Sequence, residues 1–139
     1  TYLLLSNRFA VMVGTETLSA IKKVLVVENE VIIADDIAMT VASIGFCPLE
    51  PVFDFNSAIE SYNTHQPDLV IIDIRLQGKK TGIEFAAWVR SRFNTPIVYI
   101  TVLGSKLIRH QAELTQPTAY LVKPFVNQEL VDLVNLILG

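Results

Sequence analysis

The stretch Asp68-Leu-Val-Ile-Ile-Asp-Ile-Arg-Leu76 decides the fold class of this chain. Four apolar residues, three of them β-branched, stand in one continuous run between two aspartates. A run that does not alternate with polar residues is typical of a strand buried on both faces, as in a parallel sheet covered by helices. Residues 69–72 are therefore predicted to form a central strand, with Asp73 directly after its carboxyl end.

Three further runs of the same kind predict more strands of one parallel sheet. They are Val24–Val27, Ile97–Ile100 and Tyr120–Val122. A weaker strand is predicted at Leu49–Phe53. The prolines at positions 48 and 51 favour an edge position for it, because proline cannot donate a hydrogen bond to a neighbouring strand.

Helical segments lie between these strands. Apolar residues recur at helical spacing within Val31–Ile44, and Gly45 follows as a stop signal. Asn56 and Asn127 are predicted N-caps of two later helices. The remaining helices are predicted at Asn56–Thr64, Gly82–Arg92, Ser105–Leu114 and Asn127–Leu138.

This alternation gives a (βα)5 chain. With right-handed crossovers it predicts an α/β fold with a doubly wound, flavodoxin-like sheet of five parallel strands, in the order 2-1-3-4-5. Helices on both faces make it a three-layer αβα sandwich.

Composition narrows the functional class. The chain has 139 residues, which suits one domain. Apolar residues make up 51% and the mean hydropathy is +0.44, yet no apolar stretch approaches the ~18–20 residues that a membrane span needs. The net charge of −3 provides no basic footprint for nucleic acid. The single cysteine, Cys47, excludes an intramolecular disulfide framework and a Cys-rich zinc site, so a soluble, cytoplasmic domain is expected.

Residues 1–21 differ from the rest of the chain. They hold only two charged residues, Arg8 and Glu16, and lack the basic start and long apolar run of a signal peptide. We interpret 1–21 as an N-terminal apolar extension to a domain of residues 22–139. Two alternatives stay open: upstream or vector-derived residues ordered by packing, or an arm that binds a partner or a second copy.

Polar side chains are predicted to converge at the carboxyl ends of the strands, where parallel α/β sheets bind their ligands. Glu28-Asn29-Glu30 follow the first strand, Asp73 the third, Thr101 ends the fourth, and Lys123-Pro124 follow the fifth. Carboxylate and carbonyl oxygens suit a hard cation such as Mg²⁺. A carboxylate there can also attack phosphorus, with a hydroxyl and an ammonium group to bind the phosphoryl oxygens.

Five short motifs, in this order, resemble those of response-regulator receiver domains, and the resemblance covers residues 22–139. They are Lys23-Val-Leu-Val-Val-Glu-Asn-Glu30, Asp68-Leu-Val-Ile-Ile-Asp-Ile-Arg-Leu76, Thr81-Gly-Ile-Glu-Phe85, Pro96-Ile-Val-Tyr-Ile-Thr101 and Ala119-Tyr-Leu-Val-Lys-Pro-Phe125. The resemblance implies a signalling domain of two-component systems that assists its own aspartyl phosphorylation and dephosphorylation, rather than an enzyme.

The resemblance also implies roles for single residues in phosphorylation. Asp73 matches the phosphoacceptor and Lys123 the phosphate-pairing lysine. Thr101 matches the switch hydroxyl and Tyr120 the switch aromatic residue. The bond between Lys123 and Pro124 is usually cis in the family.

A Mg²⁺ site is implied in the same way. Its expected ligands are Glu28, Asn29, Asp73 and the backbone carbonyl of Arg75. Asn29 departs from the pattern, because the family usually has an aspartate there, so weaker metal binding is expected. Asn29 is equally well interpreted as a helix cap. Val102, in place of a small residue, is expected to hinder access to the phosphoryl group.

The expected function is that of a receiver which takes a phosphoryl group from a histidine kinase or phosphotransfer protein. Phosphorylation would switch an interaction surface formed by the segments 105–114, 120–122 and 127–138. The alternative is an atypical receiver that acts as a phosphorylation-independent docking or dimerisation module, and a homodimer is open in either case. Two kinds of enzyme are disfavoured. A phosphatase of the haloacid-dehalogenase type would have a second aspartate where this chain has Arg75, and a flavin-binding protein would have a phosphate-binding loop where this chain has the acidic loop Glu28-Asn29-Glu30. Contacts with nucleic acid or membrane are not expected.

Overall fold

A sheet of five parallel strands forms the central layer of the domain. The computed structural model describes residues 12–13, 16–17, 21–102 and 104–139. In spatial order the strands are β4 (Cys47–Pro48), β3 (Lys23–Val27), β5 (Leu69–Asp73), β6 (Ile97–Thr101) and β7 (Ala119–Val122). Numbered along the domain, this is the order 2-1-3-4-5, which confirms the predicted flavodoxin-like α/β fold.

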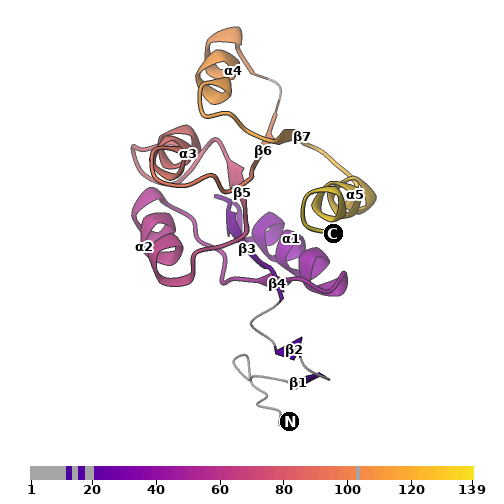
Figure 1. The fold of residues 1–139 in the computed structure, drawn as a ribbon. Coiled ribbons are helices and arrows are strands. Elements are labelled where there is room, and N and C mark those ends of the chain that lie inside the picture. The colour runs from indigo at the N-terminus through magenta and orange to yellow at the C-terminus, as the bar shows by residue number, and fades with distance from the viewer. Residues whose placement is uncertain (1–11, 14–15, 18–20, 103) are drawn as a thin grey trace.

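Helices cover both faces of this sheet and complete three layers (Figure 1). One face carries α1 (Val31–Ser43) and α5 (Asn127–Leu138). The other face carries α2 (Phe55–His65), α3 (Gly82–Arg90) and α4 (Lys106–Glu113). None of the helices in the described ranges is both long enough and apolar enough to cross a membrane.

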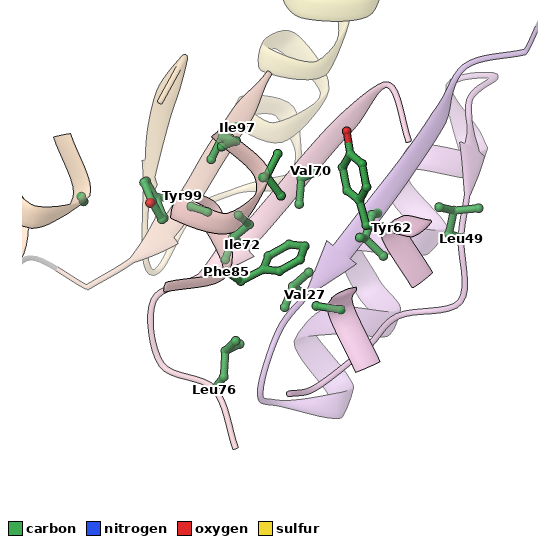
Figure 2. Packing of buried hydrophobic residues seen from close by; sticks show 14 residues of the cluster. Val27, Leu49, Tyr62, Val70, Ile72, Leu76, Phe85, Ile97 and Tyr99 are labelled. Atoms are coloured by element: carbon green, nitrogen blue, oxygen red, sulfur yellow. The ribbon is translucent and has the colours of Figure 1, made fainter. Parts of the chain in front are cut away.

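The strands are apolar on both faces because alternate side chains enter two separate clusters. Val27 of β3 packs on the side of α2 and α3, whereas its neighbour Val26 packs on the side of α1 and α5. Figure 2 shows Phe85 of α3 in the first cluster, close to Val27 and Ile72. The continuous apolar runs of the sequence are therefore buried on both faces, as predicted.

The edge strand differs from its prediction. The bounds Leu49–Phe53 are wrong: β4 is Cys47–Pro48, and only an isolated bridge at Val52 continues the pairing. Pro51 explains the difference, because it has no N–H to donate. The N–H of Val52 instead donates to the carbonyl of Val26, so the edge strand has one more residue than the facing part of β3. The predicted edge position is correct.

Two predicted N-caps are also wrong. Asp54, not Asn56, caps α2 through a 2.8 Å hydrogen bond to a backbone N–H of the first turn. Asn127 is the first residue of α5, and Val126 holds the cap position, where its N–H donates to Glu129 Oε1 at 3.0 Å. Other helix ends shift by one or two residues; α3, for example, ends at Arg90.

The predicted N-terminal extension lies mostly outside the described residues. Within it, β1 (Met12–Val13) and β2 (Glu16–Thr17) pair with each other as an antiparallel sheet separate from the central one. The origin and packing of residues 1–21 stay predictions.

Gly82 brings the start of α3 against the backbone of Asp73. A Cβ atom at position 82 would lie 2.0 Å from the Asp73 carbonyl oxygen and 2.7 Å from Cγ2 of Ile72. The Gly82 N–H donates to the Ile74 carbonyl at 2.7 Å. Only glycine fits this close approach, which fixes the chain that leaves β5 at Asp73.

We predict that Gly82→Ala lowers the free energy of unfolding by about 1–3 kcal/mol, because an added methyl group there meets backbone that cannot move aside. Urea denaturation measures the change. Gly104→Ala is the matched control, since its Cβ would have no neighbour nearer than 3.9 Å. Equal losses in the two variants would contradict this account.

Candidate functional site

Three charged side chains meet at the carboxyl edge of the sheet. The Lys123 Nζ atom lies 2.7 Å from Glu28 Oε1 and 3.0 Å from Asp73 Oδ2. Glu28 directly follows β3, Asp73 ends β5, and Lys123 follows β7. We call these three residues the charged cluster. Because parallel strands all end at the same edge, residues far apart in the sequence are brought within contact distance.

Backbone groups orient both carboxylates of the charged cluster. Glu28 Oε2 accepts a hydrogen bond from the N–H of Glu30 at 3.0 Å, and Asp73 Oδ1 accepts one from the N–H of Arg75 at 3.1 Å. Each carboxylate therefore has one oxygen held by the chain and the other facing the ammonium group. The lysine is placed by its own N–H, which donates to the Thr101 carbonyl at 2.8 Å. The peptide bond that follows it, Lys123–Pro124, is cis.

The charged cluster is short of positive charge. Glu28 is fully buried and Asp73 is 7% exposed. Burial raises the pKa of Glu28 to about 7, and Asp73 adds to the rise, whereas Lys123 and the N–H of Glu30 oppose it. Burial by itself would lower the pKa of Lys123, but its bonds to the two carboxylates outweigh burial and the pKa is raised. Glu28 Oε1 has this ammonium group as an ion-pair partner but accepts no well-directed hydrogen bond.

Thr101 and Tyr120 line one small cavity of about 50 Å³ between β6, β7 and α4. The Thr101 hydroxyl donates to the Val102 carbonyl at 2.7 Å. The Tyr120 hydroxyl is buried and has no hydrogen-bond partner among the described residues. Burial raises the pKa of Tyr120. In the described part of the chain, neither hydroxyl is hydrogen-bonded to Asp73.

The oxygen donors near the charged cluster fit Mg²⁺ as a small set. The described residues contain no group of three or more His, Cys, Asp or Glu side chains that would hold a metal ion. The ligand set expected from the sequence, Glu28, Asn29, Asp73 and the Arg75 carbonyl, holds two carboxylates and stays a prediction. Oxygen-only donors are what Mg²⁺ prefers, and Glu28 Oε1 accepts no hydrogen bond from the described residues. The cap interpretation of Asn29 is wrong, because Glu30 is the N-cap of α1.

A larger, mostly apolar cleft of about 530 Å³ opens beside Lys123. Its lining residues are Ile32, Ile33, Asp36, Val102, Lys123, Pro124 and Phe125. Ile32 is 85% exposed and Val102 is 58% exposed. Sequence analysis missed Ile32, although one signal was present. The apolar residues at helical spacing in this segment are Ile33, Ile37, Val41 and Ile44, and Ile32 is a large apolar residue outside that set, so it does not face the core.

The model of the response regulator receiver domain family matches residues 24–135. This chain belongs to that family. Receiver domains are signalling domains of two-component systems that generally bind Mg²⁺ at an acidic pocket and interact with histidine kinases or phosphotransfer proteins. In this receiver domain Glu28, Asp73 and Lys123 lie together at the carboxyl edge of the sheet.

Curated relatives support the same family. The transcriptional regulatory protein PdtaR of Mycobacterium tuberculosis is 31% identical over 115 residues, which is 83% of this chain and 56% of PdtaR. The phosphate regulon transcriptional regulatory protein PhoB of Escherichia coli is 33% identical over 113 residues, 79% of this chain and 48% of PhoB. The receiver domain described here thus spans about half the length of these relatives.

Solved structures agree with the fold. The chemotaxis protein CheY4 of Vibrio cholerae superposes with a TM-score of 0.77 at 28% identity, covering 86% of this chain and all of CheY4. The receiver domain of NtrX from Brucella abortus gives a TM-score of 0.75 at 28% identity, covering 83% of this chain and 97% of that domain.

We predict that Lys123→Met lowers the free energy of unfolding by about 1–3 kcal/mol in metal-free buffer, because it leaves two neighbouring carboxylates, one fully buried, without their ammonium partner. Millimolar Mg²⁺ should recover part of this loss. Urea denaturation measures both effects. Lys22→Met is the control, since Lys22 is exposed and precedes β3 at the opposite edge of the sheet; an equal loss there would refute the special role of the cluster.

Proposed function

We propose that this receiver domain accepts a phosphoryl group on Asp73 from a phosphohistidine of a histidine kinase or phosphotransfer protein. The observation that carries the proposal is the 3.0 Å contact between Asp73 Oδ2 and the Lys123 ammonium at the edge of the sheet. In the transfer, a carboxylate oxygen of Asp73 forms a bond to phosphorus while the bond from phosphorus to the donor imidazole nitrogen breaks. The imidazole nitrogen keeps the electron pair of that bond.

The domain contributes mainly position and charge, which phosphoryl transfer chiefly requires. Arg75 N–H holds Asp73 Oδ1, so the carboxylate presents its other oxygen beside Lys123. Lys123 then pairs with a phosphoryl oxygen, and the Thr101 hydroxyl turns from the Val102 carbonyl toward the same group. Bound Mg²⁺, held by Glu28, Asn29, Asp73 and the Arg75 carbonyl, would offset the negative charge that gathers there.

The apolar cleft beside Lys123 supports docking of the phosphodonor. Its exposed wall residues, Ile32 and Val102, stand next to the ammonium group that would receive the phosphoryl oxygens. A partner helix that buries these side chains would bring its histidine to Asp73. Docking and transfer would thus use adjoining surfaces.

The readout surface that we propose is formed by α4, β7 and α5. Large apolar side chains are exposed on these elements and at their ends: Leu107 (65%), Leu114 (70%), Val122 (40%), Val126 (63%) and Leu136 (81%). Phosphorylation adds about −1.5 to −2 charge at Asp73. The displacement of Thr101 and Tyr120 would carry this change to the surface, because both line the cavity that α4 covers.

The remaining assignments are parts of the same proposal. Residues 22–139 form the receiver unit, which works in the cytoplasm without contacts of its own to nucleic acid or membrane. Residues 1–21 are proposed as an N-terminal extension to that unit, and most of them lie outside the described residues.

A phosphorylation-independent docking or dimerisation module is the second candidate. Asn29, which lowers the negative charge of the metal site, and Val102, 58% exposed beside Lys123, favour it. It shares the fold and the exposed surfaces with the first candidate and differs only in the chemistry of Asp73.

Incubation with acetyl phosphate and millimolar Mg²⁺ should add one phosphoryl group to the intact chain, and Asp73→Asn should abolish the gain. Mass spectrometry detects the group, and the fluorescence of Trp88, which is half-buried on α3, follows the response. Asp35→Asn, at an exposed aspartate of α1, is the matched control and should behave as the parent protein does. Absence of any gain in mass would leave the docking module as the function.

Asn29→Asp should raise Mg²⁺ affinity roughly ten-fold, because it restores a carboxylate to the metal site. Titration of Mg²⁺ against Trp88 fluorescence gives the dissociation constants of both proteins. A control variant, Asn63→Asp, adds the same charge at an exposed position of α2. If both variants shift the affinity equally, only the net charge of the protein matters and Asn29 is not a ligand.

A further inference from the structure

Helix α4 is the least buried helix of the domain. Of its eight residues, only Ala112 is buried, whereas Leu107 is 65% exposed and Ile108 is 38% exposed. In Figure 1 the helix lies at the margin of the molecule, beyond the ends of β6 and β7. Apolar burial therefore contributes little to its position, and polar and cation–π contacts are left to hold it.

The carboxyl end of α4 is held by buried and bidentate polar contacts. The Thr115 hydroxyl lies 2.7 Å from the Tyr99 hydroxyl of β6 and donates to the Ala112 carbonyl at 2.5 Å. Arg90 of α3 donates from Nε to the Thr115 carbonyl at 2.8 Å and from Nη2 to the Gln116 carbonyl at 3.3 Å. Thr115 is 4% exposed and Tyr99 is fully buried, so water competes little for the two bonds of the Thr115 hydroxyl, whereas the Arg90–Gln116 bond is exposed.

The middle of α4 is held by one contact of a different kind. The Arg109 guanidinium lies 4.8 Å from the centre of the Tyr120 ring. The same ring also stacks on Tyr99, with centroids 5.7 Å apart. Arg109 also pairs with Glu113 at 3.3 Å, but both side chains are more than half exposed. The same tyrosine thus contacts both α4, through Arg109, and the buried Tyr99 that bonds to Thr115.

We infer that α4 is a hinged helix. The Tyr99–Thr115–Arg90 network is its fixed hinge, and the cation–π contact between Arg109 and Tyr120 is its latch. When Tyr120 turns, the ring leaves Arg109, and the amino-terminal part of α4 swings out about Thr115. The trigger rests on the proposed function, since phosphorylation of Asp73 is what would turn Tyr120; the hinge and latch themselves do not.

The strengths of the two contacts suit these roles. A cation–π contact at a partly exposed site changes an equilibrium about two- to five-fold, which a new charge nearby can overturn. The hinge combines several hydrogen bonds, and for the two buried ones, at the Thr115 hydroxyl, loss of one partner leaves polar groups unsatisfied. Release of the latch would therefore leave the hinge intact.

Hydrogen exchange of the unphosphorylated full chain tests the latch. Arg109→Ala should raise exchange of the amides of Arg109 and its α4 neighbours about two- to five-fold, while the amides of Thr115 and Gln116 stay unchanged. Arg92→Ala is the matched control, because Arg92 lies at the same 4.8 Å over Trp88, away from α4. Glu113→Gln removes the ion pair but keeps the guanidinium on the ring, and should leave exchange unchanged. If Arg109→Ala gives no more exchange in α4 than Arg92→Ala does, the latch is refuted.

Tyr99→Phe tests the hinge, since it removes one hydroxyl and keeps the ring that stacks on Tyr120. Exchange should rise at the amides of Thr115 and Gln116, whose N–H groups bond to Ala112 and Glu113. Tyr62→Phe is its control, because Tyr62 pairs with the Thr95 hydroxyl in the same way at a site far from α4. An unchanged rate at Thr115 and Gln116 would overturn the hinge.

Beryllofluoride with Mg²⁺ separates this inference from the proposed function. The analogue should raise exchange of the amino-terminal part of α4 in the parent protein and raise it little further in Arg109→Ala, because the latch is already open. If no beryllofluoride binds, the function proposed for Asp73 fails, while the variant data on the unphosphorylated chain still decide the latch. If it binds and loosens α4 equally in both proteins, the latch is wrong and the function stands.

Discussion

Burial of both faces of the sheet is the constraint on which the site depends. Along β3, β5 and β6 nearly every side chain enters one of the two apolar clusters, so a charged group has no place within the strands. Polar residues are accommodated where the strands end. Because the strands are parallel, these ends lie at one edge, and Asp73 meets Lys123 across 50 residues of chain. The parallel sheet therefore brings the charged side chains together from separate segments of the chain.

The charged cluster at that edge is balanced only in part. One ammonium group faces two carboxylates, and burial holds the pKa of Glu28 near 7. A site with this deficit would gain from a cation before it received the phosphoryl group that we propose, since the cation would reduce the repulsion that the incoming oxygens meet. Gly82 adds a steric condition, because α3 can begin so close to the Asp73 carbonyl only without a side chain. Both the charge of the cluster and the packing of α3 thus constrain Asp73.

The sequence was sufficient for the strand order, the two buried faces and the residues at the strand ends, because these follow from apolar runs and from the rule that parallel strands end together. It was insufficient where one backbone group decided the outcome. At Pro51 a missing N–H shifted the edge strand. The caps lie at Asp54, two residues before Asn56, and at Val126, one residue before Asn127. The Arg109–Tyr120 contact depends on tertiary placement, for which the helical spacing carries no information.

The unequal anchoring of the helices would determine which of them responds to the phosphoryl group that we propose for Asp73. Moving a two-state equilibrium from 1:99 to 99:1 takes about 5.5 kcal/mol. Burial of a residue such as Phe85 stabilises α3 by about 1.5–3 kcal/mol alone, and α3 is also fixed at Gly82. Helix α4 buries only Ala112, and its cation–π contact contributes about 0.5–1 kcal/mol. Elements that move are taken from the least stable part of a fold. A charge placed on Asp73 would therefore displace α4 well before it disturbed α3, although α3 starts closer to that carboxylate.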